Sequence, residues 1–208
     1  MKEEKDYIQD ISEIRSMMER SSKFLSLSGW AGIMAGLYAL AGAWIAYDIF
    51  YFNPDEVIYE NLSSGSTSPG IWKVIILALS ILVLTIISAI VLSSKKATKK
   101  SEKLWNATSR RLLINLGVPL VSGGLLILIL ISKGYIGFIA PFTLIFYGLA
   151  LYNAGRFTYS EIQTLGLIEI VLGLISSYFV GYGLLFWALG FGVLHIIYGI
   201  YIHYKYER

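Results

Sequence analysis

The chain has 208 residues, of which 56% are hydrophobic and 15% are charged, and its net charge is +3. A soluble domain carries about 25% charged residues, so this composition excludes an ordinary soluble domain and gives no sign of nucleic-acid binding. The chain has no cysteine and two histidines, which excludes disulfides, thiolate metal sites, cysteine nucleophiles and a histidine-rich metal centre. We therefore expect neither a metal nor another cofactor.

Residues 1–26 combine charged residues with apolar ones at helical spacing. Ile8, Ile11, Ile14 and Met18 recur in this way, which predicts an amphipathic helix on the cytoplasmic side. This helix would lie on the membrane surface or continue into the first span. The alternative is a docking helix for a protein partner or for a second copy of the chain. Because this segment lacks the apolar core of a signal peptide, we expect the first span to act as its own insertion signal.

Six apolar runs of roughly 20 residues follow, and each is long enough to cross a hydrocarbon core about 30 Å thick as a helix. A helix is required because every backbone N–H and C=O in lipid needs a partner within the chain. The expected spans are residues 27–47, 71–93, 112–132, 136–152, 162–182 and 184–203. The predicted fold class is therefore an all-α, polytopic membrane domain over residues 27–208, with no separate soluble domain.

The outer loop of residues 52–70 connects the first two spans. It contains Asp55, Glu56 and Glu60, followed by a half rich in serine, glycine and proline. We expect a flexible, solvated loop. The alternative is that its three acids attract cations.

A basic stretch at residues 94–111 determines the predicted orientation. Its cations are Lys95, Lys96, Lys99, Lys100, Lys103, Arg110 and Arg111. Of the 17 lysines and arginines in the chain, only Lys73 and Lys133 would lie on the opposite side of the membrane. Lysine and arginine favour the cytoplasmic side, so both termini are predicted to be cytoplasmic. The basic stretch could also bind anionic lipid or a partner protein.

The odd-numbered spans share two glycines that lie seven residues apart. These pairs are Gly29 and Gly36, Gly117 and Gly124, and Gly166 and Gly173. Seven residues make almost two helical turns, so each pair occupies one helix face, where small residues let helices approach closely. In the even-numbered spans, Tyr147-Gly148 aligns with Tyr198-Gly199. The matches predict three helical hairpins in a 2+2+2 internal repeat, with the glycines acting in helix packing.

These features carry two resemblances to known families. The stretch ISEIRSMMERSSKFLSLSG, residues 11–29, resembles the N-terminal signature of small uncharacterised multi-spanning membrane proteins of Bacteroidota bacteria, and it implies no activity. The repeated two-helix units of about residues 107–203 are similar in architecture to the six-spanning HdeD-type acid-resistance membrane proteins. That resemblance implies a stress-associated, non-enzymatic protein of the bacterial cytoplasmic (inner) membrane.

Two ionisable residues fall deep inside the predicted spans, where a charge costs about 2.5–3.5 kcal/mol or more and marks a functional candidate. Glu169 lies eight residues beyond Glu161, and His195 lies eight residues before His203. Both are therefore roughly 12 Å from the inner surface at 1.5 Å per residue. A short turn at residues 181–184 would bring them together. The pair would either lock two helices through a hydrogen bond or line a wet cavity as a protonatable pair.

Asn115 is a secondary candidate for this polar site. Pro119, four residues further on, removes the N–H that would bond the Asn115 carbonyl in a regular helix. The result would be a helix kink or, as the alternative, a polar cavity lining shared with Glu169.

No nucleophile, metal-ligand set or phosphate loop of recognisable spacing accompanies Glu169 and His195, so we expect no enzyme and no catalytic residues. The first functional hypothesis is a regulatory or stress-associated membrane protein that acts through residues 1–26 and the basic stretch. The alternative is a small transporter or channel for protons, cations or a small solute, with Glu169 and His195 in its path. The expected partners are membrane lipids, a second copy of the chain and a cytoplasmic protein bound through residues 1–26.

Overall fold

A computed structural model describes residues 27–52, 69–99 and 105–208 of the chain. The predicted N-terminal helix of residues 1–26, the three acids of the outer loop, and Lys100 and Lys103 of the basic stretch lie outside these described residues. The described part consists of helices joined by short connections, so the predicted all-α class is confirmed.

Six helices of the described part are long and apolar enough to cross a membrane, as predicted. The first three spans are α2 (Gly29–Trp44) with the π-helical η1 (Ile45–Ile49), α4 (Pro69–Lys99), and α5 (Ala107–Ser132). The fourth comprises η2 (Ile136–Phe138), α6 (Ile139–Ala154) and η3 (Gly155–Phe157), and the fifth is α7 (Ser160–Tyr178). The sixth comprises η4 (Val180–Tyr182), α8 (Gly183–Trp187), the π-helical η5 (Ala188–Leu194) and α9 (His195–Tyr206).

The described part of the basic stretch is largely helical. Helix α4 continues to Lys99, so Lys95, Lys96 and Lys99 all belong to it. Lysine and alanine are good helix formers, and residues 94–99 contain no glycine or proline that would end the helix. Arg110 and Arg111 likewise belong to α5. The basic stretch therefore covers the end of α4, the start of α5 and the residues between them.

A capping box fixes the start of α5. The Asn106 side chain accepts a hydrogen bond from the Ser109 N–H at 2.8 Å, and the Ser109 hydroxyl accepts one from the Asn106 N–H at 2.9 Å. This reciprocal pair satisfies N–H groups that have no partner within the helix. At the far end of the fifth span, α7 ends at Tyr178, earlier than predicted, because Phe179 has non-helical angles (φ −105°, ψ 63°).

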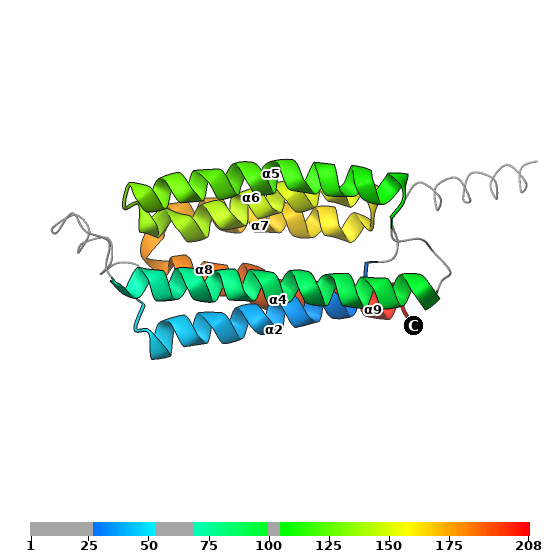
Figure 1. The fold of residues 1–208 in the computed structure, drawn as a ribbon, viewed down its shortest axis with the longest axis horizontal. Helices are drawn as coiled ribbons and strands as arrows, with labels where there is room; N and C mark the ends of the chain where they lie inside the picture. The colour runs from blue at the N-terminus through cyan, green and yellow to red at the C-terminus, as the bar shows by residue number, and fades with distance from the viewer. Residues whose placement is uncertain (1–26, 53–68, 100–104) are drawn as a thin grey trace, which may run out of the picture.

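The helices form two layers (Figure 1). One layer contains α5, α6 and α7, with α6 packed between the other two. The second layer contains α2, α4 and the segments of the sixth span, with α2 packed on α4, η5 and α9. Helix α8 contacts α6 and joins the layers. Helix α7 packs chiefly on α6, and the sixth span packs chiefly on α2, so the three-hairpin repeat stays a prediction.

Four of the six predicted packing glycines lie where another helix backbone approaches. A methyl group added at Gly29, Gly36, Gly166 or Gly173 would come within 3.0 Å of backbone atoms of a neighbouring helix. Among the described residues no atom lies within 4 Å of the same position at Gly117 or Gly124, so this pair packs against no helix there. Helix α5 packs on α6 through Gly123, beside Phe146, so its glycine pair faces away from that contact.

Candidate functional site

The structure brings Glu169 of α7 and His195 of α9 together at the junction of the two layers. The His195 Nδ1 atom lies 3.6 Å from the Glu169 Oε1 atom. Glu169 has no exposed surface, and His195 is 6% exposed. Tyr147 of α6 and Gly190 of η5 complete the group, which we call the central cluster: Tyr147, Glu169, Gly190 and His195.

The hydrogen bonds of His195 determine which ring nitrogen carries the proton in the neutral form. The Gly190 carbonyl lies 2.9 Å from Nδ1, and a carbonyl can only accept, so Nδ1 donates. The Nε2 atom of the neutral ring therefore has a lone pair, and it accepts a hydrogen bond from the Tyr147 hydroxyl at 2.8 Å. Both ring nitrogens are satisfied without the glutamate.

Glu169, in contrast, has no hydrogen-bond partner at either carboxyl oxygen among the described residues. Burying an ionised carboxylate without hydrogen bonds costs free energy. An imidazolium next to the carboxylate offsets part of that cost. The cluster therefore has two compatible states. It can combine a neutral carboxylic acid with a neutral ring, or a carboxylate with an imidazolium whose Nδ1–H faces both Gly190 and Glu169.

Gly190 makes room for the glutamate, a role that the sequence reading missed. A methyl group added at Gly190 would lie 2.5 Å from the Glu169 Oε2 atom and 2.6 Å from the Leu144 Cδ2 atom. Gly190 lies in the π-helical η5, and such wider turns occur often at functional sites. The only sequence signal was a glycine five residues before a buried histidine, which is too weak to use without the neighbouring helices.

Aromatic and aliphatic side chains enclose the central cluster. The Phe191 ring stacks on the His195 ring at a centroid distance of 5.8 Å, and it lies 4.9 Å from the Tyr147 ring. Leu144 has no exposed surface. Ser176 of α7 is also fully buried, and its hydroxyl lacks a partner among the described residues. Water does not reach the carboxyl oxygens of Glu169 in this structure, because both have less than 1 Å² of exposed surface.

Asn115 does not contribute to this cluster. Its side-chain amide donates a hydrogen bond to the Arg111 carbonyl, one turn back in α5, at 2.8 Å. Helix α5 lies at the edge of its layer and packs mainly on α6, so Asn115 has no role beside Glu169.

A second polar group lies where α2 begins and where α4 and α9 end. The Lys96 ammonium donates to the Glu207 carboxylate at 2.9 Å and to the Leu27 carbonyl at 2.6 Å. Glu207 also accepts hydrogen bonds from the Gly29 N–H at 2.8 Å and lies 2.6 Å from the His203 Nδ1 atom. We call Leu27, Gly29, Lys96, His203 and Glu207 the helix-end network.

The helix-end network corrects the prediction that Lys96 faces lipid or a partner. The Lys96 side chain is only 10% exposed, whereas Lys95 and Lys99 are exposed. Ser93 and Ala97 are buried on α4, and Lys96 continues that inward face. The helical spacing that places Lys96 on the same face as Ser93 and Ala97 was present in the sequence, but it is difficult to recognise within a run of lysines.

The charge of Glu207 is strongly stabilised. Burial acts to raise the pKa of its carboxyl group, but hydrogen bonds from His203, Lys96 and the Gly29 N–H outweigh burial and lower the pKa to about 2. Close by, Glu161 of α7 accepts hydrogen bonds from Lys205 at 2.6 Å and from the Tyr206 hydroxyl at 3.0 Å. Ionised pairs therefore hold α7 and α4 to the end of α9.

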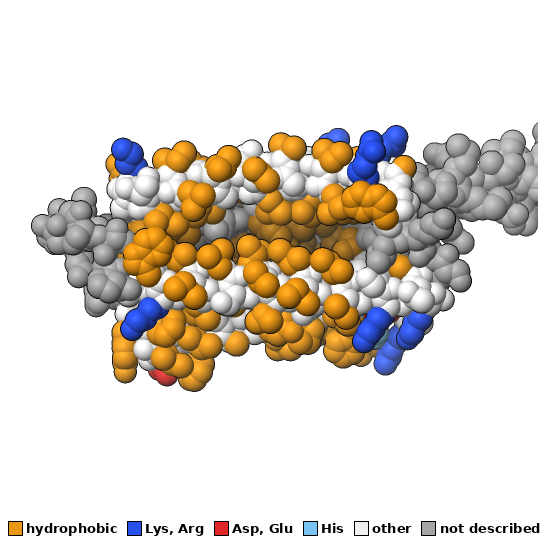
Figure 2. All heavy atoms as spheres, in the orientation of Figure 1, with side chains coloured by type: hydrophobic (Ala, Val, Ile, Leu, Met, Phe, Trp, Pro, Cys, Tyr) orange, Lys and Arg blue, Asp and Glu red, His pale blue; other side chains and the backbone are white. Residues whose placement is uncertain are grey.

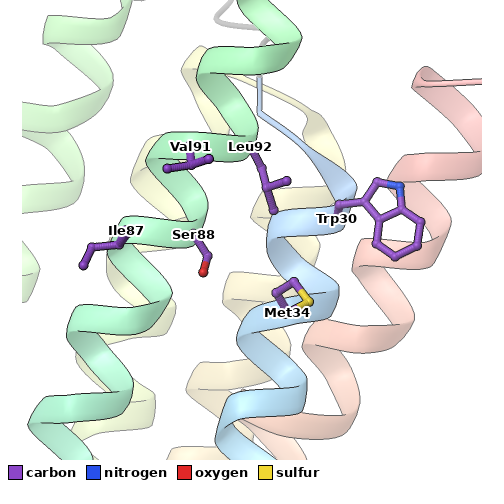
Figure 3. Close-up of a pocket in the computed structure, with 6 residues that line it drawn as sticks. All are labelled: Trp30, Met34, Ile87, Ser88, Val91 and Leu92. Carbon is purple, nitrogen blue, oxygen red and sulfur yellow. The ribbon is translucent and has the colours of Figure 1, made fainter.

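An apolar groove of about 430 Å³ lies between α2 and α4 (Figure 3). Its lining residues are Trp30, Met34, Ile87, Ser88, Val91 and Leu92. The one polar side chain, Ser88, shares a hydrogen bond with the Tyr38 hydroxyl at 3.2 Å. The groove has no acid or base, and in the described part of the chain no three His, Asp or Glu side chains gather closely enough to hold a metal ion.

Fold and cluster together define a broad class, that of six-helix, multi-pass membrane proteins with an acid–imidazole pair buried between helices. Comparison with known proteins adds no narrower assignment: no family model, no curated protein and no solved structure matches the chain. The function is therefore argued from the central cluster and the helix-end network.

Proposed function

We propose that this chain is a non-enzymatic, regulatory or stress-associated membrane protein in which the central cluster is a proton-responsive lock between helices. One observation supports this above all others: Glu169 is fully buried beside His195, and in the described part of the chain neither of its oxygens has a hydrogen-bond partner. When a carboxyl group in that position gains or loses a proton, the cost of burying it changes, and with it the packing of the helices around it.

The lock acts through three helices. Tyr147 on α6, Glu169 on α7 and His195 on α9 belong to different elements, and they bridge the two layers. Transfer of the Glu169 proton to His195 pairs the resulting carboxylate with an imidazolium. Loss of that proton to solvent instead leaves an uncompensated buried carboxylate, which separation of the helices relieves. A change in pH would thus be converted into a change in the contact between α7 and α9.

Transport of protons, cations or a small solute is the second candidate. Ionisable residues within spans commonly mark such pathways, and Ser176 provides another buried polar atom on α7 without a partner among the described residues. Against transport, the Glu169 oxygens are sealed from water. The alternative therefore requires an open state in which water reaches the cluster.

The orientation and the repeat complete the proposal. Both termini lie in the cytoplasm of a bacterium, and the spans form three hairpin repeats in its inner membrane. In support, the lysines and arginines visible in Figure 2 lie at the two ends of the bundle. The exposed cations Lys95, Lys99, Arg110 and Arg111 bind anionic headgroups of the inner leaflet, and residues 1–26 contact a cytoplasmic partner.

Distance measurements between spin labels test the lock. The chain has no cysteine, so one label each can be placed at exposed positions of α7 and α9, Leu174 and Ile197. In nanodiscs we expect the α7–α9 distance to change with pH in the wild type and to stay constant in Glu169→Gln. Asp48→Asn, which alters an exposed acid outside both the central cluster and the α7–α9 contact, should retain the change. A wild-type distance that is constant between pH 5 and 9 would refute the lock.

A further inference from the structure

The groove between α2 and α4 is apolar and open at the surface of the bundle (Figure 3). Its volume is about 430 Å³, within the range of roughly 300–1,000 Å³ that is usual for small-molecule sites. Trp30, Ile87 and Val91 line it and are 50%, 53% and 45% exposed. Because α2 and α4 are both long and apolar enough to be spans, the open side of the groove faces lipid.

Lys95 and Lys99 continue the face of α4 that lines the groove. Lys95 lies seven residues after Ser88 and four after Val91, and Lys99 lies seven residues after Leu92. Residues four and seven positions apart share one face of a helix. Both lysines are exposed. Two cations therefore lie just beyond the groove, on its own side of α4, where that helix ends.

The charges of these two lysines are available to a ligand. Glu207, an acid at this end of the bundle, is already paired with Lys96 at 2.9 Å. Within the described part of the chain the lysine ion pairs are those of Lys96 and Lys205, and neither Lys95 nor Lys99 has an acidic partner. An anionic group placed beyond the end of the groove would be attracted by both.

Trp30 indicates how deep the groove lies in the membrane. Its ring packs edge-on against the His203 ring, at a centroid distance of 5.5 Å, beside the helix-end network. Tryptophan favours the membrane–water interface, so this end of the groove lies at the level of the lipid headgroups. Ile87, at the other end, is eight residues before Lys95, or roughly 12 Å deeper at 1.5 Å per residue.

We propose that the groove binds an acyl chain of an anionic phospholipid whose headgroup phosphate pairs with Lys95 and Lys99. A phospholipid provides both halves of the match in one molecule: an apolar chain for the groove and a negative charge for the lysines above it. Of the proposed function, this site rests only on the attraction of Lys95 and Lys99 for anionic headgroups. It does not depend on the central cluster.

The size of the groove favours an acyl chain over a helix. A helix about 10 Å across would fill roughly 900 Å³ over a length of about 12 Å, which is about twice the volume of the groove. An acyl chain is a single file of methylene groups and enters without displacing α2 from α4. The occupant is therefore a lipid rather than a helix of a second copy.

Native mass spectrometry of the full chain in detergent tests the headgroup half of the site. Phosphatidylglycerol and phosphatidylcholine with the same two oleoyl chains would be titrated into the wild type. We expect one phosphatidylglycerol to bind about tenfold more tightly than phosphatidylcholine. Lys95→Gln with Lys99→Gln should abolish that preference. Arg110→Gln with Arg111→Gln removes the same charge and should retain most of it, because no residue of α5 lines the groove.

Two outcomes of this titration would overturn the site. Equal losses in the two double variants would leave the general attraction of the cations for headgroups intact but refute a site at the groove. A wild type without a preference for phosphatidylglycerol would refute both. Neither outcome bears on the lock, which the spin-label distances test separately.

A bulky side chain in the groove tests the acyl half of the site. Val91→Trp fills the groove from α4, whereas Ile90→Trp places the same ring at a neighbouring position that is 60% exposed and does not line it. Val91→Trp should weaken the binding of phosphatidylglycerol several-fold, and Ile90→Trp should bind as the wild type does. If both variants bind as the wild type does, the acyl chain lies elsewhere and the proposal fails.

Fluorescence of Trp30 gives a readout that requires no bulky substitution. The part of the emission that Trp30→Phe removes reports on the groove. In liposomes, phosphatidylglycerol with brominated acyl chains should quench this part at a several-fold lower mole fraction than brominated phosphatidylcholine does. Lys95→Gln with Lys99→Gln should make the two lipids equivalent. Equal quenching of the wild type by both lipids would overturn the proposal.

Discussion

The central cluster and the helix-end network each place a glutamate beside a histidine, but they treat the carboxyl group in opposite ways. Glu207 accepts hydrogen bonds from Lys96 and the Gly29 N–H and pairs with His203. Glu169 has no exposed surface and accepts no hydrogen bond from the residues that the structure describes. The first glutamate is held in its charged form and fastens helix ends together. The second glutamate is held only by packing. Gain or loss of its proton therefore changes the free-energy cost of burying its carboxyl group among the surrounding side chains.

The largest expected effect is the loss of the cation in the helix-end network. Lys96→Met leaves the Glu207 carboxylate nearly buried without its ammonium partner, and such a loss costs about 3 kcal/mol of the free energy of unfolding. Lys95→Met, on the exposed side of the same turn, should change it by less than about 0.5 kcal/mol. Chemical unfolding in detergent micelles measures both. Equal effects would show that the ion pair contributes nothing.

The next effect concerns the space that Gly190 provides in the central cluster. Gly190→Ala forces a methyl group against the Glu169 carboxyl and Leu144, and overpacking of this kind costs about 1–3 kcal/mol. In a Glu169→Ala background the same substitution should cost distinctly less, because the carboxyl that it meets is gone. A double-mutant cycle measured by unfolding tests this coupling. Additive effects would mean that Gly190 does not accommodate Glu169.

A smaller effect is the acid sensitivity of the helix-end network. The pKa of Glu207 is lowered from 4.5 to about 2 in the folded chain, so its stabilising contribution is complete above pH 4.5 and disappears as the pH falls toward 2. Thermal stability of the wild type should therefore decline over that interval. Glu207→Gln should be less stable at pH 7 and should lack that part of the decline. Parallel curves for both proteins would contradict the assignment.

The smallest stability change is expected for Glu169→Gln. The amide has nearly the shape of the acid and replaces one unpartnered polar group with another, so the free energy of unfolding should shift by less than about 1 kcal/mol at neutral pH. Its effect should appear instead in the α7–α9 distance, which loses its response to pH. A loss of several kcal/mol would show that Glu169 forms a strong ion pair in the folded state.

Hydropathy and charge along the sequence predict the features that the membrane itself requires, namely the spans and the depth of residues within them. The six spans follow from the length of apolar runs, and the shared depth of Glu169 and His195 follows from counting residues along two helices. The contact itself agrees with that geometry, because their atoms lie 3.6 Å apart. For Glu207, in contrast, the sequence indicates only the i,i+4 partner His203 and gives no hint of Lys96 or the Gly29 N–H.

What the sequence could not predict depends on which helix faces which. The glycine pairs of α2, α5 and α7 look alike, yet two of them contact a helix backbone, whereas the pair at Gly117 and Gly124 contacts none among the described residues. Lys96 cannot be distinguished from Lys95 in the sequence, because the difference is the contact of Lys96 with Glu207 at the end of α9. Tyr147 and Gly190 join the central cluster only because α6 and the π-helical η5 meet there. Local patterns identify a face, and tertiary packing decides what covers it.

Proton flux into proteoliposomes tests most directly whether the central cluster is a lock rather than a pathway. Wild-type and Glu169→Gln proteins would be reconstituted at equal density and given a transmembrane pH gradient with a trapped pH indicator. The lock predicts that both collapse the gradient no faster than protein-free liposomes. A faster collapse with the wild type that Glu169→Gln abolishes would contradict the account and establish transport through the cluster.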